Sequence, residues 1–300
     1  MAQQELILGY EQTAGTNWSL GARFVAREFA DVIEDIGGDW AMYYLEGIDI
    51  QRWWGLLANP GSDISAWVDG DGDGDLEHYS WTAEELGYPE AQRKYYAVEL
   101  TAKKRFANNW TADFMYTWSQ SYGNYEGYVD STIGQSDGGI TELFDYPGLA
   151  DNSYGPLPND RRHNFKAFGV YSFDFGMQLG GSLWYQTGRP INCQGVHPTD
   201  AWAASYSVAS FYCQGQPMPR GSIGTTDDAY ALDLMAKYDF DLGSTDLYVR
   251  LDVFNLTDAN AVTEVDEAGD LDTGGVNDSY LSATRFQPPR SVRFGIGVTF

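Results

Sequence analysis

The chain has 300 residues, of which 43% are hydrophobic and 15% aromatic, and its 18 Lys and Arg against 43 Asp and Glu give a net charge of −25. This much apolar surface excludes intrinsic disorder, which requires a chain too polar to offset the entropy of ordering. The acidic excess excludes a nucleic-acid binder, because affinity for phosphate comes from clustered Lys and Arg. The sequence contains no run of about 18 apolar residues, so it predicts no membrane-spanning helix.

About nine segments alternate apolar and polar side chains with a period of two, which is typical of β-strands with unlike faces. In the last of them Val292, Phe294 and Ile296 lie on one face, and Arg293 and Gly295 lie on the other. Most are roughly ten residues long, whereas strands of soluble proteins are usually about 5 to 6 residues long. In chain order the predicted strands are 5–11, 18–27, 96–103, 110–119, 164–173, 177–186, 230–240, 246–254 and 291–300.

Short and long connectors alternate between these strands. The short ones are rich in Gly, Asn and Asp, as tight hairpins require, and the long ones are acidic. In an up-and-down sheet this alternation places all long loops at one end and all short turns at the other. Outer-membrane barrels have short periplasmic turns and long extracellular loops, so the sequence predicts an all-β fold, an antiparallel transmembrane β-barrel portion. The short turns are 14–17, 107–109, 174–176 and 241–244, and the long loops are 30–93, 122–161, 187–228 and 258–285.

Aromatic side chains near the strand ends, such as Trp18, Trp110, Tyr238 and Phe240, are candidates for the interfacial girdles of a membrane barrel. A soluble β-sandwich also alternates apolar and polar residues, and its core also contains aromatic side chains. Strand length and one-sided loops favour the barrel over the sandwich.

Several motifs carry a family resemblance that extends over essentially the whole chain. Four segments resemble the closing barrel strands of TonB-dependent outer-membrane receptors, and two more resemble the Oar-like branch of that family. The four segments are Pro158–Phe165, Tyr185–Pro190, Asp252–Asp258 and Phe286–Ser291, and the two further ones are Ser119–Glu126 and Met218–Ser222.

The resemblance implies a large barrel closed around an N-terminal plug and energised nutrient uptake across the cell outer membrane of a Gram-negative bacterium. It implies three further partners besides the lipid bilayer: the plug, the TonB system that acts through it, and the barrel assembly machinery. In this family the assembly machinery reads a C-terminal aromatic residue, which is Phe300 here. The alternative role for Phe300 is a simple lipid-facing strand end. The resemblance identifies neither the substrate nor the residues that bind it.

The predicted strand count departs from the family, whose barrels have about 22 strands around a plugged lumen. With nine strands the first and the last run in the same direction, so they cannot close the barrel as antiparallel neighbours. Residues 1–10 also show no cationic segment followed by an apolar stretch, so no secretory signal is predicted. We therefore expect residues 1–300 to be the C-terminal part of a receptor barrel, with the plug and the first strands elsewhere.

The segment 69–75 reads Asp-Gly-Asp-Gly-Asp-Gly-Asp, which places oxygen ligands at alternate positions, as calcium loops do. The position at which an EF-hand has its closing Glu is Ser80, so Glu77 or a distant carboxylate must replace it. The alternative is a solvated acidic tip. Calcium is the one candidate cofactor and none is required; its candidate ligands are Asp69, Asp71, Asp73, Asp75 and Glu77.

Cys193 and Cys213 lie in one long loop. An extracellular loop is in an oxidising environment, so we predict a disulfide bond between them. Closing a loop of this size stabilises the fold by about 3 kcal/mol in the chain-entropy model, and unpaired thiols are the alternative. The acidic residues of the long loops, including Glu34, Asp35 and Asp39, are expected to form a solvated surface.

Nothing in the sequence predicts catalysis. The histidines are His78, His163 and His197, and none has a partner at metal-ligand spacing. We therefore expect no enzyme, and the leading hypothesis is a component of an outer-membrane transporter. The alternatives are a calcium-dependent outer-membrane surface or adhesion protein and, less favoured, a soluble β-sandwich that binds or cleaves glycans.

Overall fold

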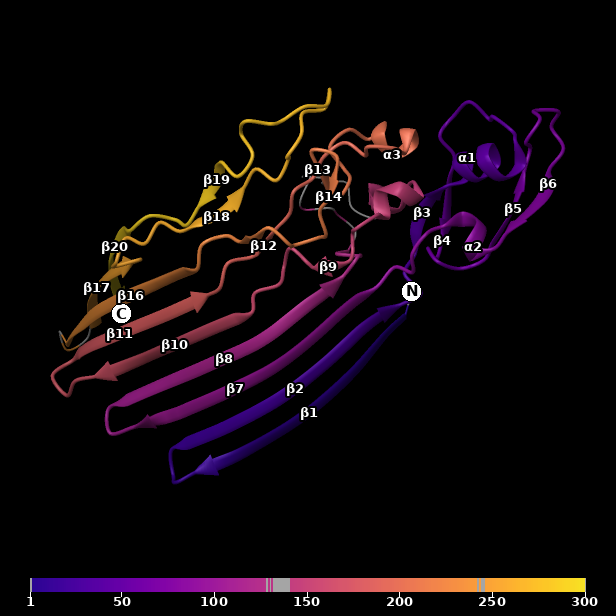
Figure 1. Cartoon of the computed structure of the whole chain (residues 1–300). Coiled ribbons are helices and arrows are strands. Elements are labelled where there is room, and N and C mark those ends of the chain that lie inside the picture. Colours follow the sequence, from indigo (N-terminus) through magenta and orange to yellow (C-terminus); the bar gives the residue numbers. More distant parts are fainter. Residues whose placement is uncertain are drawn as a thin grey trace.

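The computed structural model describes residues 2–299 except 128, 130, 132–140, 242, 244 and 245. Nine long strands form one meandering sheet in the order β1-β2-β7-β8-β10-β11-β16-β17-β20 (Figure 1). Each strand pairs with its neighbour in antiparallel orientation. The predicted all-β antiparallel fold is therefore confirmed. The candidate assembly signal Phe300 lies outside the described residues.

All nine predicted strands are present, and five of them are longer than the sequence pattern indicates. A short strand, β9 (Gly155–Pro156), extends the sheet by pairing with the outer end of β8. The long strands are β1 (Ala2–Ala14), β2 (Trp18–Ala30), β7 (Arg93–Ala107), β8 (Trp110–Gly123), β10 (His163–Ser172), β11 (Met177–Gln186), β16 (Ala229–Asp241), β17 (Asp246–Phe254) and β20 (Ser291–Thr299).

The hairpin turns gather at one end of the sheet and the long loops at the other (Figure 1). The turn between β7 and β8 shows why the sequence folds this way locally. Asn108 and Asn109 adopt left-handed backbone conformations with φ of 55° and 69°, and the flanking Ala107 and Trp110 pair across the turn. A two-residue hairpin turn of type I′ needs positive φ at both central positions, and Asn tolerates that conformation better than most residues do.

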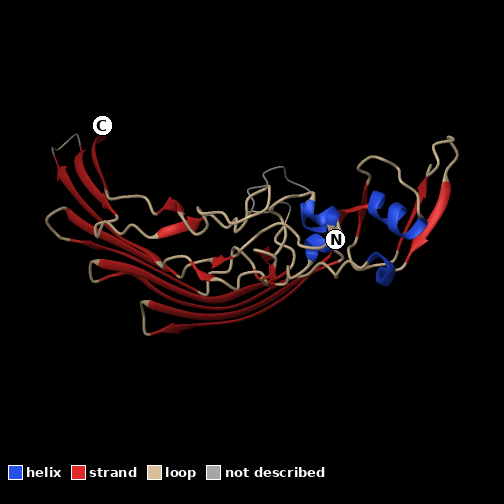
Figure 2. Ribbon diagram, turned by 45° about the horizontal axis from the view of Figure 1, so that its top comes forward, coloured by secondary structure: helices blue, strands red, loops and turns tan. Residues whose placement is uncertain are grey.

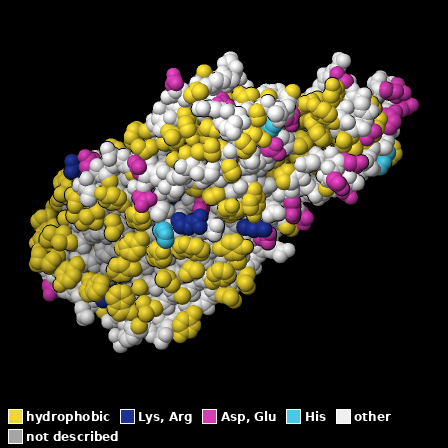
Figure 3. Space-filling model, viewed as in Figure 1, with side chains coloured by type: hydrophobic (Ala, Val, Ile, Leu, Met, Phe, Trp, Pro, Cys, Tyr) yellow, Lys and Arg dark blue, Asp and Glu magenta, His cyan; other side chains and the backbone are white. Residues whose placement is uncertain are grey.

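The two faces of the sheet differ in chemistry. On one face, apolar side chains line up across neighbouring strands, as in the row of Leu8, Phe24 and Val98, and all three are exposed. Figure 3 shows such hydrophobic side chains covering the strands. The opposite face carries ion pairs between strands, among them Arg23 with Glu99. An exposed apolar face and a charged face are the pattern of a membrane barrel with lipid outside and a polar lumen.

The sheet is curved but does not close (Figure 2). Within the described residues β1 and β20 each have one neighbour in the sheet, and both run from the loop end to the turn end. Two strands of the same direction cannot pair antiparallel, as the odd strand count predicts. No helix among the described residues is both long and apolar enough to cross a membrane.

The long loops contain regular structure that the sequence patterns did not predict. Short antiparallel strand pairs and single helical turns make up most of it. They are β3 (Glu34–Gly37) with β4 (Gly55–Ala58), β5 (Ile64–Val68) with β6 (Glu77–Trp81), β12 (Pro190–Ile191) with β15 (Gly224–Thr225), β13 (Tyr212–Cys213) with β14 (Gln216–Pro217), β18 (Val262–Val265) with β19 (Ala283–Phe286), and the helical turns α1 (Gly38–Ala41), η1 (Met42–Glu46), α2 (Ala83–Leu86), η2 (Glu142–Phe144), η3 (Pro147–Ala150) and α3 (Ala201–Ala204).

The main buried apolar core lies in these loops and not on the sheet. Ile36, Met42, Leu86, Phe144 and Phe211 are at most 1% exposed and belong to one cluster, although they come from three different long loops. This location follows from the sheet, because a barrel strand offers one face to lipid and the other to the lumen. The three loops therefore fold together as one body at the outer end of the sheet.

Candidate functional site

The family-like motifs converge where the strands meet the outer loops. Asp160, which is 4% exposed, accepts hydrogen bonds from the backbone N–H of Ser121 at 2.9 Å and from Arg162 at 2.9 Å. The neighbouring Arg161 donates to the carbonyl of Thr187 at 3.1 Å. These contacts join the loop before β10 to the end of β8 and to the segment after β11. The motif residues thus fasten three strand ends together.

A second set of contacts fastens the Tyr185–Pro190 motif to the start of β16. The carboxylate of Asp228 accepts hydrogen bonds from the hydroxyl of Tyr185 at 2.6 Å and from the N–H of Gly188 at 3.0 Å. A Cβ on Gly188 would lie 1.8 Å from the carbonyl oxygen of Thr226, so only glycine fits there. His163 begins β10, and its ring forms a hydrogen bond with the hydroxyl of Tyr116 at 2.8 Å.

The motif of Asp252–Asp258 works in the same way at β17. Asn255 adopts a left-handed conformation with φ of 49°, and its N–H donates to Asp233 on β16 at 2.8 Å. Its side-chain amide donates to the carbonyls of Ala259 at 2.8 Å and Pro288 at 3.0 Å. One amide therefore closes the ends of the last long loop. This role depends on residues far apart in sequence, so the motif alone did not reveal it.

A cavity of about 410 Å³ opens between the first two motif regions. Polar side chains contribute much of its lining, including Asp160, Arg162, Thr187, Ser222 and Asp228. The pair of Arg162 and Asp160 offers a guanidinium held in place by a buried carboxylate, and Asp228 adds an acceptor. Such a set of groups is able to hydrogen-bond a small polar ligand. No substrate-binding residue is predictable from the sequence, because spacing alone does not show that these five residues lie together.

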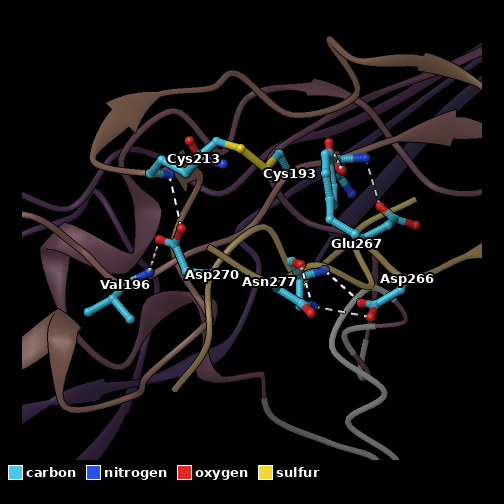
Figure 4. The surroundings of a disulfide bond; sticks show 11 residues. Cys193, Val196, Cys213, Asp266, Glu267, Asp270 and Asn277 are labelled. Carbon is cyan, nitrogen blue, oxygen red and sulfur yellow. Dashed lines mark hydrogen bonds between the residues drawn. A yellow bond between two sulfur atoms is a disulfide. The ribbon is translucent and has the colours of Figure 1, made fainter. Parts of the chain in front are cut away.

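The two cysteines form the predicted disulfide bond, with their Cα atoms 5.5 Å apart (Figure 4). The bond supports a contact with the last long loop. Asp270 accepts hydrogen bonds from the N–H of Val196 at 3.1 Å and of Gln214 at 3.1 Å, one residue from each side of the bridge. The disulfide therefore holds two backbone donors in place for one carboxylate, and Figure 4 shows Asp270 directed toward Val196 and toward the Cys213 end of the bridge.

An ion pair beside the disulfide joins the same two loops. Glu267 contacts the guanidinium of Arg189, and these side chains are 2% and 12% exposed. Glu267 also accepts the N–H of Asn192 at 2.7 Å. Burial raises the pKa of Glu267, and the neighbouring Arg189 offsets part of that effect.

The acidic segment 69–75 forms the loop of the β5–β6 hairpin. It brings together three of the five candidate calcium ligands, because carboxylate oxygens of Asp69, Asp71 and Asp73 lie within 4.8 Å of one another. Asp75 and Glu77 stand outside this group, and Glu77 accepts the N–H of Gly70 at 3.4 Å. Asp69 accepts the N–H groups of Gly72 at 2.7 Å and Gly74 at 3.1 Å, which fold the loop around its carboxylate. Calcium binding stays a prediction.

The expectation that the acidic loop residues form a solvated surface is wrong for Glu34, Asp35 and Asp39. Their exposed fractions are 0%, 8% and 6%. The physical reason is that β3 and α1 pack into the loop core between Val32, Ile36 and Met42, so neighbouring residues are buried with them. The apolar residues that flank these carboxyls are the feature of the sequence that indicates burial. The high number of charges in the loop favoured the opposite prediction.

The curved meander with one apolar and one charged face defines the class of protein: an outer-membrane β-barrel. The sequence model of the family described as an outer membrane beta barrel domain matches residues 4–188, and the chain belongs to this family. The TonB-dependent transporter Oar of Myxococcus xanthus is 28% identical to this chain over 341 residues, which cover 100% of the chain and 28% of Oar. The predicted resemblance and the location in the Gram-negative outer membrane are thereby confirmed.

Solved structures share the fold at lower sequence identity. The outer membrane transporter YddB of Escherichia coli aligns with a TM-score of 0.50 and 12% identity, over 98% of this chain and 32% of YddB. The chain thus spans about a third or less of the length of both relatives.

Proposed function

We propose that the chain is the C-terminal part of the barrel of a TonB-dependent transporter and that its outer loops contribute to substrate capture. The observation that carries this proposal is the match to Oar over the whole chain. The one-sided loops and the lipid-type outer face support it. Transport, and not catalysis, is the role that this arrangement fits.

The unpaired edges of β1 and β20 set a condition on the complete barrel. An antiparallel barrel closes with an even number of strands, so an odd number of further strands must join these two edges. In the proposal these strands and the plug belong to the rest of the receptor, and the TonB system acts through the plug. The charged lumen face, with Arg23 and Glu99, is the surface that the plug would contact. Phe300 is the residue that the barrel assembly machinery would read.

The polar cavity beside Arg162 and Asp228 is the proposed place of contact between the outer loops and a substrate. To test transport, cells with the native protein are compared with cells carrying Arg162→Ala and Asp228→Ala, and depletion of solutes from the medium is measured by mass spectrometry. We expect solutes whose uptake stops with an uncoupler and slows in the variant. Cells that lack the gene are the second comparison. The proposal fails if these cells and wild-type cells deplete the same solutes at the same rate.

A second candidate is calcium-dependent surface adhesion, which the convergence of Asp69, Asp71 and Asp73 favours. Terbium luminescence sensitised by nearby tryptophan is the direct probe, with Asp71→Asn as the variant and Asp151→Asn, an exposed carboxylate in another loop, as the control. Adhesion requires luminescence that Asp71→Asn abolishes and cell attachment that a chelator reverses. If neither is observed, this candidate is rejected.

A further inference from the structure

Four buried carboxyl groups lie where three long loops meet. Glu34, Asp35 and Asp39 come from the loop between β2 and β7, and Asp145 comes from the loop between β8 and β10. They are at most 8% exposed. One oxygen each of Glu34, Asp35 and Asp39 has no hydrogen-bond partner among the described residues. Buried carboxylates normally have a cation or several donors as partners, so this group needs an explanation.

Three of the four carboxyls bond directly from one loop to another, and Asp35 lies beside Glu34 in β3. Glu34 accepts the N–H of Thr141 at 2.9 Å, which joins the first loop to the second. Asp39 accepts the hydroxyl of Tyr146 at 3.1 Å, which makes the same connection. Asp145 accepts the hydroxyl of Tyr206 at 2.5 Å, which joins the second loop to the third. The geometry is that of a clasp across three loops.

Nothing cationic neutralises the clasp among the described residues. The charged groups with the largest effects on its carboxyls are the other carboxyls of the clasp and Glu142. Glu142 lies in the helical turn that ends at Asp145. The titratable hydroxyls that face them are those of Tyr88, Tyr146 and Tyr206, and they are neutral at ordinary pH. In the described part of the chain none of the four forms an ion pair with Lys, Arg or His.

A shared metal ion does not fit the clasp. Among the described residues, the carboxylates whose oxygens converge to within 4.8 Å of one another in a group of three are those of Asp69, Asp71 and Asp73. The clasp carboxyls are spread around the loop junction and do not converge on one point. Because the carboxyls are separate, each of them is able to bind its own proton, and protonation is the way of neutralising them that fits this arrangement.

We propose that these four carboxyls form a proton-operated clasp that keeps the three outer loops together in acidic and neutral media and releases them as the medium becomes alkaline. Opening the loops would hydrate the carboxylates and end their mutual repulsion. The clasp is independent of the transport proposal, since it concerns the loops of this chain alone. It would control access to the lumen from outside.

The direction of the pH effect follows from burial. Desolvation, with the charges of Asp35 and Asp145, raises the pKa of Glu34 from 4.5 to about 8, and desolvation raises the pKa of Asp145 to about 7. A group with a raised pKa binds its proton more tightly in the closed state. Protonation of Glu34 therefore stabilises the closed state fully below pH 4.5, which is the ordinary pKa of this group. This stabilisation is lost as the pH rises through the raised pKa of about 8.

Pulsed electron spin resonance on the full chain in its native outer membrane tests the clasp. Spin labels go on Ser62→Cys in the first loop and Ala201→Cys in the third, both exposed positions, while the native cysteines stay paired. We expect one narrow distance distribution at low pH. The ratio of open to closed loops then rises by up to about tenfold per pH unit for each titrating carboxyl and levels off above the raised pKa.

Two variants separate the clasp from a general effect of alkali. Glu34→Gln should flatten the pH dependence, whereas Glu84→Gln, which changes an exposed carboxylate of the same loop, should leave it unchanged. Infrared spectra of the wild type, which do not depend on any variant folding, should show a protonated carboxyl band at neutral pH that disappears in alkali. A distance distribution that is constant across this pH range would overturn the proposal, as would the absence of that infrared band.

Discussion

Replacing Glu267 by Gln tests how the third and fourth long loops are held together. The substitution keeps an oxygen that accepts the N–H of Asn192, but it removes the negative charge beside Arg189. Breaking a buried ion pair by removing one partner costs about 3 to 5 kcal/mol, because the remaining charge is left without compensation. Arg189 keeps its hydrogen bond to the carbonyl of Pro190 at 3.1 Å, so we expect a cost of about 2 to 4 kcal/mol.

Hydrogen exchange at the Gln194 amide reports this cost locally. This N–H donates to the carbonyl of Glu267 at 2.9 Å, so it exchanges when the two loops separate. A loss of 2 to 4 kcal/mol corresponds to an exchange rate about 30- to 1000-fold faster in Glu267→Gln. The matched control is Glu264→Gln, which removes an exposed ion pair with Arg285 in the same loop and should change the rate less than about tenfold. Equal effects of the two variants would refute the reasoning.

Two other substitutions test a barrel hairpin turn and the disulfide bond. Lys104→Met removes an ammonium that donates to the carbonyls of Ala107 at 2.7 Å and Trp110 at 2.8 Å. This variant should lower the free energy of unfolding, measured by urea unfolding from lipid, by about 2 to 3 kcal/mol. An unchanged urea midpoint would contradict this. Cys193→Ser removes a constraint worth about 3 kcal/mol and should make residues 193–213 sensitive to protease, and two reactive thiols in the unreduced native protein would argue against the bond itself.

The barrel strands were predictable because their environment imposes a simple rule. A strand between lipid and lumen must alternate apolar and polar side chains over its whole length. The pattern at Val292, Phe294 and Ile296 therefore indicates a barrel strand directly. The disulfide was predictable because a chain with two cysteines allows one pairing.

The loop body was not predictable in the same way. In β3 all four residues are buried, so Glu34 and Asp35 show no alternation, and their charge suggested solvent. The core into which Ile36 of β3 packs contains Phe144 and Phe211, which are distant in sequence. The motif residues posed the same problem, since Asp160 acts on the backbone of Ser121 in an earlier strand. Periodicity reports local environment, and these contacts are non-local.

The central claim is that the long loops face the cell exterior while the hairpin turns face the periplasm. Labelling of single introduced cysteines with a membrane-impermeant maleimide tests it most directly, with Ser62→Cys in a long loop and Thr16→Cys in the first turn, both exposed. We predict that Ser62→Cys reacts in intact cells and that Thr16→Cys reacts only after the outer membrane is permeabilised. Labelling of Thr16→Cys in intact cells, with Ser62→Cys protected, would contradict the account.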